Sequence, residues 1–324
     1  MLLRKRIRLL CVLLAVLLFA LAIVGIAIWE ARHSDFSSSS DWEMAEYVEH
    51  NGEYYRLRTD VDTLLVMGVD KFSDAAVEGS YNNDQCADFL LLLAIDRKSE
   101  RCSVIAINRD TVTDVPVLGI GGKRTGTVRQ QITLAHTYGT GGEDSCRNTA
   151  HAVSELFGGL IVDGFVCLTM DAVGILNDAV GGVSVTIKGD LTAIDPAFCD
   201  GQTVCLTGEQ ALRFVRFRAG LADSTNASRM ERQEQYLSAF YTALLGFAAE
   251  EETIPTDVAA SLSPHMHSDL SASELERAYE TLPAFGRGEF STLAGDYTVG
   301  EFMEFHPDEE DLKEKILSLF YEKI

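Results

Sequence analysis

The sequence predicts an α/β fold, with helices on both faces of a mainly parallel or mixed β-sheet and one transmembrane helix before it. Three observations lead to this prediction. Short β-rich apolar runs alternate with helical patterns along most of the 324 residues. One run, Leu90–Ile95, is almost continuously apolar, as expected for a strand that is covered on both faces. A separate stretch, Leu9–Ile28, contains no charged side chain.

The uncharged stretch predicts a membrane anchor at residues 9–29. Its 20 residues would form about 30 Å of helix, enough to cross a bilayer. Residues 1–8 carry four basic side chains, so the positive-inside rule predicts a cytoplasmic N-terminus and an exported C-terminal part. A cleaved signal peptide with a site near Ala20-Leu21-Ala22 is the alternative, but the apolar run continues past Ala22. We therefore expect a single-pass protein of the cell membrane, with a flexible linker at residues 30–59.

The charge of the chain excludes several classes of function. The net charge is −22, and outside residues 1–29 the chain has 23 basic against 49 acidic side chains, a net of −26. Such a surface argues against nucleic acid as a partner, because phosphate contacts need basic residues. A hydrophobic content of 47% argues against intrinsic disorder. Six cysteines follow the predicted anchor. They could form up to three disulfides, with Cys199 and Cys205 as a local pair, or remain as buried free thiols.

Residues 60–324 are expected to form one extracytoplasmic domain, with a core at 60–247 and an acidic C-terminal extension at 248–324. The expected strands are Asp62–Val69, Phe89–Ile95, Ser103–Ile107, Phe165–Thr169 and Val183–Ile187. The expected helices are Thr127–Tyr138, Arg147–Phe157, Asp171–Val180, Glu209–Phe217, Arg229–Phe247 and Asp308–Tyr321. Capping boxes at Thr207 and Ser228 predict two helix starts, and Gly181-Gly182 predicts a helix end.

Arginines in this acidic chain gather near two predicted helix ends. Arg229, Arg232 and Gln233 share one helix face close to an N-terminus, which suits an anion. Arg216 and Arg218 leave the preceding helix and would point the same way if the chain is extended there. The alternative for the helix arginines is a solvated amphipathic surface.

Carboxylates stand at the ends of predicted strands. Arg109 and Asp110 follow the strand Ser103–Ile107, Asp88 precedes another strand, and Asp70 ends the first. Taken with the arginines, they predict a site for a phosphorylated ligand with a divalent cation held by carboxylates. The alternatives are a loop ion pair for Arg109-Asp110 and ordinary turn chemistry for the aspartates.

Other catalytic signatures are missing from the sequence. There is no P-loop, no nucleophile elbow, no paired-histidine zinc motif on a helix, and no C-x-x-C pair. His136 and His151 stand isolated in the sequence and are interpreted as structural. Phosphate chemistry therefore rests on the arginines and carboxylates.

Several longer stretches carry a family resemblance. They are Leu64–Asp70, Asp88–Asp96, Ile107–Thr111, Ile132–Gly139, Leu176–Val183, Leu206–Leu212 running into Val215–Arg218, and Arg229–Gln233. In their order and spacing the chain resembles the LytR-CpsA-Psr family of bacterial envelope proteins. The resemblance implies a three-layer α/β/α fold with a central mixed sheet, and a phosphotransferase that moves a glycopolymer from a polyprenyl-pyrophosphate carrier to peptidoglycan.

The resemblance also implies roles for individual residues. Asp88 and Asp110 would hold Mg²⁺, with Arg109 beside them in the catalytic set. Pyrophosphate would be bound by Arg109, Arg216, Arg218, Arg229, Arg232 and Gln233. A non-catalytic envelope module that binds isoprenoid phosphates or wall polymer, and an anchored pyrophosphatase, remain alternatives.

The chain departs from the family pattern at positions around these residues. Cys86 stands where the family usually has arginine, and Asn108 stands in place of proline. The family's Lys-Ile-Asn segment reads Gln131-Ile132-Thr133, and Asn226 replaces a common aspartate. These changes are expected to affect the rate of transfer and the preference for the lipid-linked donor.

Overall fold

The computed structural model describes residues 44–72, 86–118, 123–139, 141–217, 226–250, 256–271, 273–275, 277 and 285–324. The predicted basic tail and anchor, the first part of the linker, and Arg218 lie outside these ranges. Within them, no helix is both long and apolar enough to span a bilayer. The described chain divides into two compact units. The single extracytoplasmic domain at 60–324 stays a prediction.

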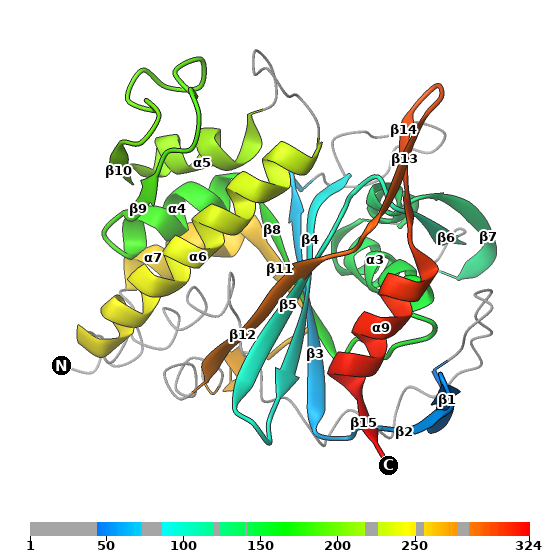
Figure 1. The fold of residues 1–324 in the computed structure, drawn as a ribbon. Coiled ribbons are helices and arrows are strands. Elements are labelled where there is room, and N and C mark those ends of the chain that lie inside the picture. Colours follow the sequence, from blue (N-terminus) through cyan, green and yellow to red (C-terminus); the bar gives the residue numbers. More distant parts are fainter. Residues whose placement is uncertain are drawn as a thin grey trace. The chain divides into compact units, whose positions relative to one another are not determined.

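The larger unit contains residues up to Leu168, His267–Glu274 and Ala284–Ile324. Its centre is a six-stranded sheet in the order β11-β8-β3-β4-β5-β12 (Figure 1). These strands are β3 Val61–Val69, β4 Ala87–Asp96, β5 Arg101–Ile107, β8 Gly164–Thr169, β11 Met266–Ser268 and β12 Gly286–Thr292. Strand β4 is antiparallel to β3 and β5, whereas β12 is parallel to β5. The mixed α/β class and the central mixed sheet are therefore confirmed, and the three-layer arrangement stays a prediction.

The core of this unit explains why the sheet forms where the apolar runs lie. Leu65 and Met67 of β3 are fully buried and belong to one hydrophobic cluster with side chains of two helices. One is α3, Gly142–Leu156, and the other is α9, Glu309–Phe320, the predicted C-terminal amphipathic helix. The buried apolar residues of both helices thus share one core with these sheet residues.

Smaller pairings surround the central sheet. Strands β1 Tyr47–His50 and β2 Glu53–Leu57 pair with β15 Tyr321–Lys323. Two hairpins are formed by β6 Val112–Leu118 with β7 Arg124–Gln131, and by β13 Gly295–Val299 with β14 Met303–Pro307. A 3₁₀ helix, η3, covers Ile132–Tyr138.

The predicted helix Thr127–Tyr138 is wrong in its first part. Residues up to Gln131 belong to β7, where Val128 pairs with Val115 across the hairpin. Thr127 and Val128 are β-branched, which favours a pleated strand once a partner strand is available. Only the remainder is helical, as a 3₁₀ helix.

The smaller unit contains residues Thr169–Met266 and Leu275–Pro283. Strands β9 Val183–Thr186 and β10 Thr203–Leu206 pair antiparallel. The helices are α4 Asp171–Ala179, α5 Gly208–Arg216, α6 Asn226–Glu250, α7 Thr256–Leu262 and the 3₁₀ helix η4 Ser263–His265. Helices α4 and α5 approach closely at two glycines, because a Cβ on Gly208 would lie 2.6 Å from the carbonyl oxygen of Gly174.

Two of the three helix boundaries that the sequence predicted in this unit are confirmed. The capping box at Thr207 is present, with reciprocal hydrogen bonds to Gln210. Gly181 and Gly182 adopt φ of 79° and 95° after α4, which favours glycine. The start predicted at Ser228 is wrong, because α6 begins at Asn226 and Ser228 lies inside its first turn. Asparagine and serine both suit a helix start, so the sequence pattern alone did not distinguish them.

All six cysteines in the described part of the chain are free thiols. Cys86, Cys102, Cys146 and Cys167 are buried, and Cys199 and Cys205 are exposed. The local pairing of Cys199 with Cys205 is therefore not formed, and burial accounts for four of the six as small apolar side chains.

Candidate functional site

The antiparallel register of β4 and β5 places two chemically important segments at one edge of the sheet. Leu90 pairs with Ile107, so the first residues of β4 lie opposite those that follow β5. Asp88 stands near the start of β4, and Arg109 and Asp110 follow β5 directly. The register therefore brings Asp88, Arg109 and Asp110 to the same edge of the sheet.

Arg109 lies between the two carboxylates. Its Nη1 donates a hydrogen bond to Asp88 Oδ1, and its Nε lies 3.5 Å from Asp110 Oδ1. The side chains of Arg109, Asp88 and Asp110 are 19%, 21% and 13% exposed, so all three are partly open to solvent. The arrangement is more than a loop ion pair, since one guanidinium contacts one carboxylate on β4 and another in the turn after β5.

Neutral donors complete the surroundings of both carboxylates. Thr133 Oγ1 lies 3.5 Å from Asp88 Oδ1, and Gln131 Nε2 lies 3.4 Å from Asp110 Oδ1. The backbone N–H of Asp110 donates to Asn108 Oδ1 at 3.0 Å. Three residues that depart from the family pattern thus contact or orient the two carboxylates.

The fourth departure, Cys86, lies at the same edge. Its thiol is buried, and burial followed by the nearby Asp88 carboxylate raises its pKa. The Thr133 hydroxyl forms a hydrogen bond with this thiol. Cys86 is therefore a neutral group beside Asp88, where the family pattern has a positive charge.

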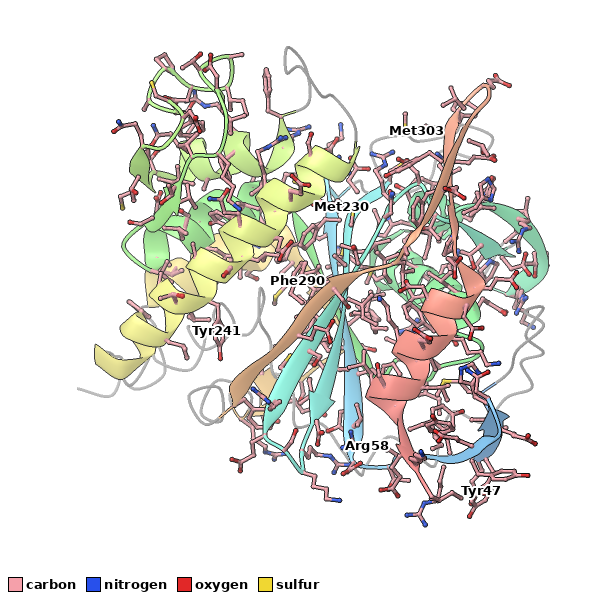
Figure 2. The ribbon with its side chains drawn as sticks, in the orientation of Figure 1. Tyr47, Arg58, Met230, Tyr241, Phe290 and Met303 are labelled. Atoms are coloured by element: carbon pink, nitrogen blue, oxygen red, sulfur yellow. The ribbon has the colours of Figure 1, made fainter. Side chains whose placement is uncertain are left out.

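The C-terminal hairpin supports the loop that carries Asp110. The N–H of Phe305 donates to the carbonyl of Asp110 at 2.8 Å, and Gln131 Nε2 donates to the carbonyl of Met303 at 2.7 Å. Met303 is the first residue of β14 and is labelled in Figure 2. Asn108 Nδ2 donates to the Tyr297 hydroxyl at 2.5 Å. These contacts could not be found from the sequence, because about 190 residues of chain separate the partners.

In the smaller unit, Arg229, Arg232 and Gln233 lie together on α6 and are 4%, 7% and 9% exposed. Arg232 donates from Nε to the carbonyl of Phe214 at 3.0 Å, from Nη1 to that of Ser228 at 3.2 Å, and from Nη2 to that of Phe217. Gln233 Nε2 donates to the carbonyl of Val215 at 3.2 Å. The solvated-surface alternative is thus wrong for these side chains, because they are buried.

These contacts concentrate on the C-terminal turn of α5. Helix C-termini leave carbonyl groups without intrahelical partners, and a buried guanidinium satisfies several of them at once. Arg216 is exposed on the same turn. The smaller unit therefore gathers Arg216, Arg229, Arg232 and Gln233, while the larger unit gathers Asp88, Arg109 and Asp110.

One interpretation from the sequence needs correction within the larger unit. His136 is not isolated, because its Nε2 lies 3.7 Å from Cys146 Sγ. Cys167 is also close, and the three ligand atoms lie within 4.8 Å of one another. The three residues come from separate segments, so no short sequence motif could reveal them.

A mixed α/β unit with a guanidinium between two partly exposed carboxylates offers groups that could hold an anion and a divalent cation. The model of the LytR_cpsA_psr family matches residues 30–309, and the chain belongs to this family.

Two curated relatives are named polyisoprenyl-teichoic acid–peptidoglycan teichoic acid transferase TagU. The protein from Halalkalibacterium halodurans is 29% identical over 178 residues, which are 55% of this chain and 51% of the relative. That from Oceanobacillus iheyensis is 26% identical over 251 residues, 77% of this chain and 70% of the relative. The chain thus spans about half the length of the first relative.

Solved structures share the fold. TagT bound to LIIa-WTA has a TM-score of 0.63 at 21% identity, covering 81% of this chain and 90% of that one. TagT of B. subtilis has a TM-score of 0.59 at 22% identity, with the same coverage. At these identities the likeness supports the mixed α/β fold alone.

Proposed function

We propose that the chain is a membrane-anchored phosphotransferase that moves a glycopolymer from a polyprenyl-pyrophosphate carrier to peptidoglycan. The observation that carries the proposal is the guanidinium of Arg109 between Asp88 and Asp110. Membership of the family and the names of the TagU relatives support the reaction class. Phosphoryl transfer needs positioning and charge neutralisation more than covalent chemistry, which suits this set of residues.

The carboxylates fit a magnesium ion by their chemistry. Asp88 and Asp110 offer hard oxygen ligands and are partly open to solvent, one on β4 and the other in the turn after β5. The neutral side chains of Gln131 and Thr133 also lie beside them. Bound Mg²⁺ would neutralise charge on the pyrophosphate oxygens.

The chain's own residues then have separate tasks. Arg109 would hold a phosphate oxygen while it keeps both carboxylates in place, because a guanidinium has five N–H donors. Arg216, Arg218 and Arg229 would neutralise the diphosphate. Arg232 and Gln233 would act as positioning residues, since they donate hydrogen bonds to backbone carbonyls of α5 and α6.

The predicted location supports the same proposal. An anchor at residues 9–29 would keep the exported domain at the cell membrane, beside a donor that is itself held in the bilayer. Tethering both reactants raises their effective concentration. The partners are then the lipid-linked glycan, peptidoglycan and the membrane, with no nucleic acid.

The test is a transfer assay with the full-length chain in detergent, Mg²⁺, a labelled polyprenyl-pyrophosphate glycan and peptidoglycan oligosaccharides. We expect label on the oligosaccharides, and a loss of at least about a hundredfold for Asp88→Asn and Asp110→Asn. Asp114→Asn is the matched control, because Asp114 lies on β6 and its carboxylate pairs with Arg129 at 3.9 Å. Unchanged transfer in both site variants would refute the assignment.

A binding module is the second candidate, favoured by the neutral Cys86, Gln131 and Thr133 around the carboxylates. It predicts binding of the lipid-linked glycan that persists in Asp88→Asn, with no label moved to either acceptor or water. Release of the labelled polymer phosphate into water would instead indicate the pyrophosphatase alternative.

A further inference from the structure

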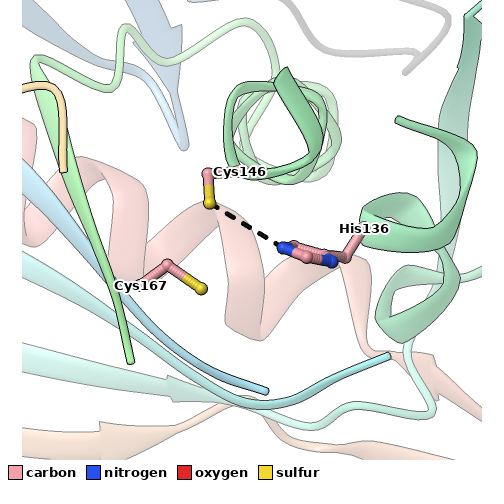
Figure 3. A group of neighbouring side chains, drawn as sticks. All are labelled: His136, Cys146 and Cys167. Carbon is pink, nitrogen blue, oxygen red and sulfur yellow. Dashed lines mark hydrogen bonds between the residues drawn. The ribbon is translucent and has the colours of Figure 1, made fainter. Parts of the chain in front are cut away.

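A second group of ligand-type side chains lies in the core of the larger unit, in the sheet's hydrophobic cluster. His136 comes from η3, Cys146 from α3 and Cys167 from β8 (Figure 3). Cys146 and Cys167 are fully buried and His136 is 3% exposed. The ligand atoms of these three side chains lie close enough together to bind the same metal ion.

The spacing of the three atoms suits one metal centre. A tetrahedral zinc ion binds sulfur at about 2.3 Å and nitrogen at about 2.0 Å, which places two of its ligands roughly 3.5–3.8 Å apart. The 3.7 Å between Cys146 Sγ and His136 Nε2 falls in this range. All three ligand atoms lie within 4.8 Å of one another, so small side-chain rotations would fill three of the four positions of a tetrahedral ion, with a water molecule as the fourth ligand.

We propose that His136, Cys146 and Cys167 form a structural zinc site in the core of the larger unit. Two thiolates and a neutral imidazole carry a total charge of −2, which Zn²⁺ cancels. A monovalent ion such as Cu⁺ would leave a net negative charge buried, and that is costly in an apolar core. Thiolate and imidazole ligands also select zinc over the hard cation expected at Asp88 and Asp110.

Zinc binding would change the protonation of the group. Hydrogen bonds from Cys167 and then from His136 outweigh burial and lower the pKa of Cys146, whereas burial and the same thiol pair raise the pKa of Cys167. A bound cation would displace the protons that remain on the two thiols.

The ring of His136 can present its Nε2 to the ion. Its Nδ1 is buried and has no hydrogen-bond partner among the described atoms. No hydrogen-bond acceptor at Nδ1 therefore fixes the tautomer of the ring. The tautomer depends instead on the contact of Nε2 with the Cys146 thiol. A metal at Nε2 would leave the proton on Nδ1.

The position of the site indicates its effect. The ion would join η3, α3 and β8, which are separate segments of one unit. Element η3 also carries Thr133, which lies beside Asp88. A zinc ion would thus hold the segment that supports the carboxylate pair, and because the group is buried it would enter during folding.

Elemental analysis of the full-length chain, produced with zinc in the medium and purified without chelator, tests the proposal. We expect one zinc per chain in the wild type and in Cys102→Ala, and loss of most of that zinc in Cys146→Ala and Cys167→Ala. Cys102 is the matched control, because it is also a buried free thiol, on β5.

A measurement on the unmutated chain keeps the proposal testable if the core variants fail to fold. The wild type is unfolded, stripped of metal and refolded with Co²⁺, and thiolate-to-cobalt charge-transfer absorption is expected. Its absence, zinc no higher than background, or copper in place of zinc would overturn the proposal. So would a Cys146–Cys167 disulfide, detected as a cross-linked peptide pair in a non-reducing digest. These readouts do not depend on transferase activity.

Discussion

Replacing Arg232 with alanine tests whether this buried guanidinium holds the protein together or binds ligand. Arg232 donates to three backbone carbonyls, those of Phe214, Phe217 and Ser228. A hydrogen bond from a charged donor contributes roughly 1.5–3 kcal/mol net. Three at the low end give about 4 kcal/mol, because helix-end carbonyls regain some hydration when the donor is removed.

Urea unfolding followed by circular dichroism measures this loss. With a slope of about 2 kcal/mol per molar urea, the transition of the smaller unit should move down by about 2 M. Arg232→Lys should lose most of the same stability, since an ammonium cannot reach carbonyls in three directions. Arg213→Ala is the control, because Arg213 is 40% exposed and pairs with two carboxylates, Glu209 at 2.8 Å and Asp195 at 3.4 Å, so its removal should shift the midpoint less than the removal of Arg232.

The opposite result would refute the structural role. If Arg232→Ala unfolds at the wild-type midpoint but no longer binds the lipid diphosphate, the guanidinium acts on ligand. If Arg232→Lys kept the wild-type urea midpoint, the positive charge at this position would matter and the geometry of the guanidinium would not.

Three further outcomes are expected. Gly208→Ala should lower stability by about 2 kcal/mol, because its Cβ would meet the Gly174 carbonyl at 2.6 Å, whereas Gly246→Ala in α6 meets nothing within 4 Å and should raise the thermal midpoint. Burial raises the pKa of Asp62 to about 6, so the native state keeps this proton longer than the unfolded chain. The stability that this proton contributes, on the order of 2 kcal/mol, is present below pH 4 and lost as pH rises through 6, and Asp62→Asn should remove the dependence in urea titrations. Burial opposes ionisation of Asp96, but backbone and arginine hydrogen bonds lower its pKa to about 2, so its contribution is present above pH 4 and lost as pH falls through 2. Asp96→Asn should therefore reduce the loss of unfolding free energy between pH 4 and pH 2. The same loss in this variant as in the wild type would contradict the assignment.

The elements that the sequence predicted well are those fixed by local or strongly apolar signals. The run Asp62–Val69 matches β3 within one residue, and the capping box at Thr207 marks the start of α5. A fully buried strand or a capped helix end can be predicted without knowing which segment packs against it. The segment Thr127–Gln131 could not be predicted in this way, because it becomes a strand only by pairing with β6.

The candidate site was predictable in part for the same reason. Asp88 stands at the start of one predicted strand and Arg109 and Asp110 follow the next, and antiparallel pairing of the two strands brings these ends together. The hydrogen bonds of Arg232 to α5 were not predictable, because spacing on a helix says which residues share a face and not what covers it. The contacts of the C-terminal hairpin with Asn108 and Gln131 depend on pairing across most of the chain.

The neutral residues around the carboxylates have a consequence for cation binding. Asp88, Asp110 and Arg109 together carry a charge of −1, and Gln131 adds none where the family pattern has lysine. Gln131→Lys would place a positive charge near Asp110 Oδ1, which now lies 3.4 Å from the amide nitrogen. At that separation the repulsion of a cation is worth at least about 1 kcal/mol, so Mg²⁺ affinity should fall roughly tenfold. Thr127→Lys adds the same charge to the same strand, four residues and about 13 Å away, where salt screens it. Calorimetric titration with Mg²⁺ should separate the two variants, and equal affinities would show that Asp110 does not hold the ion.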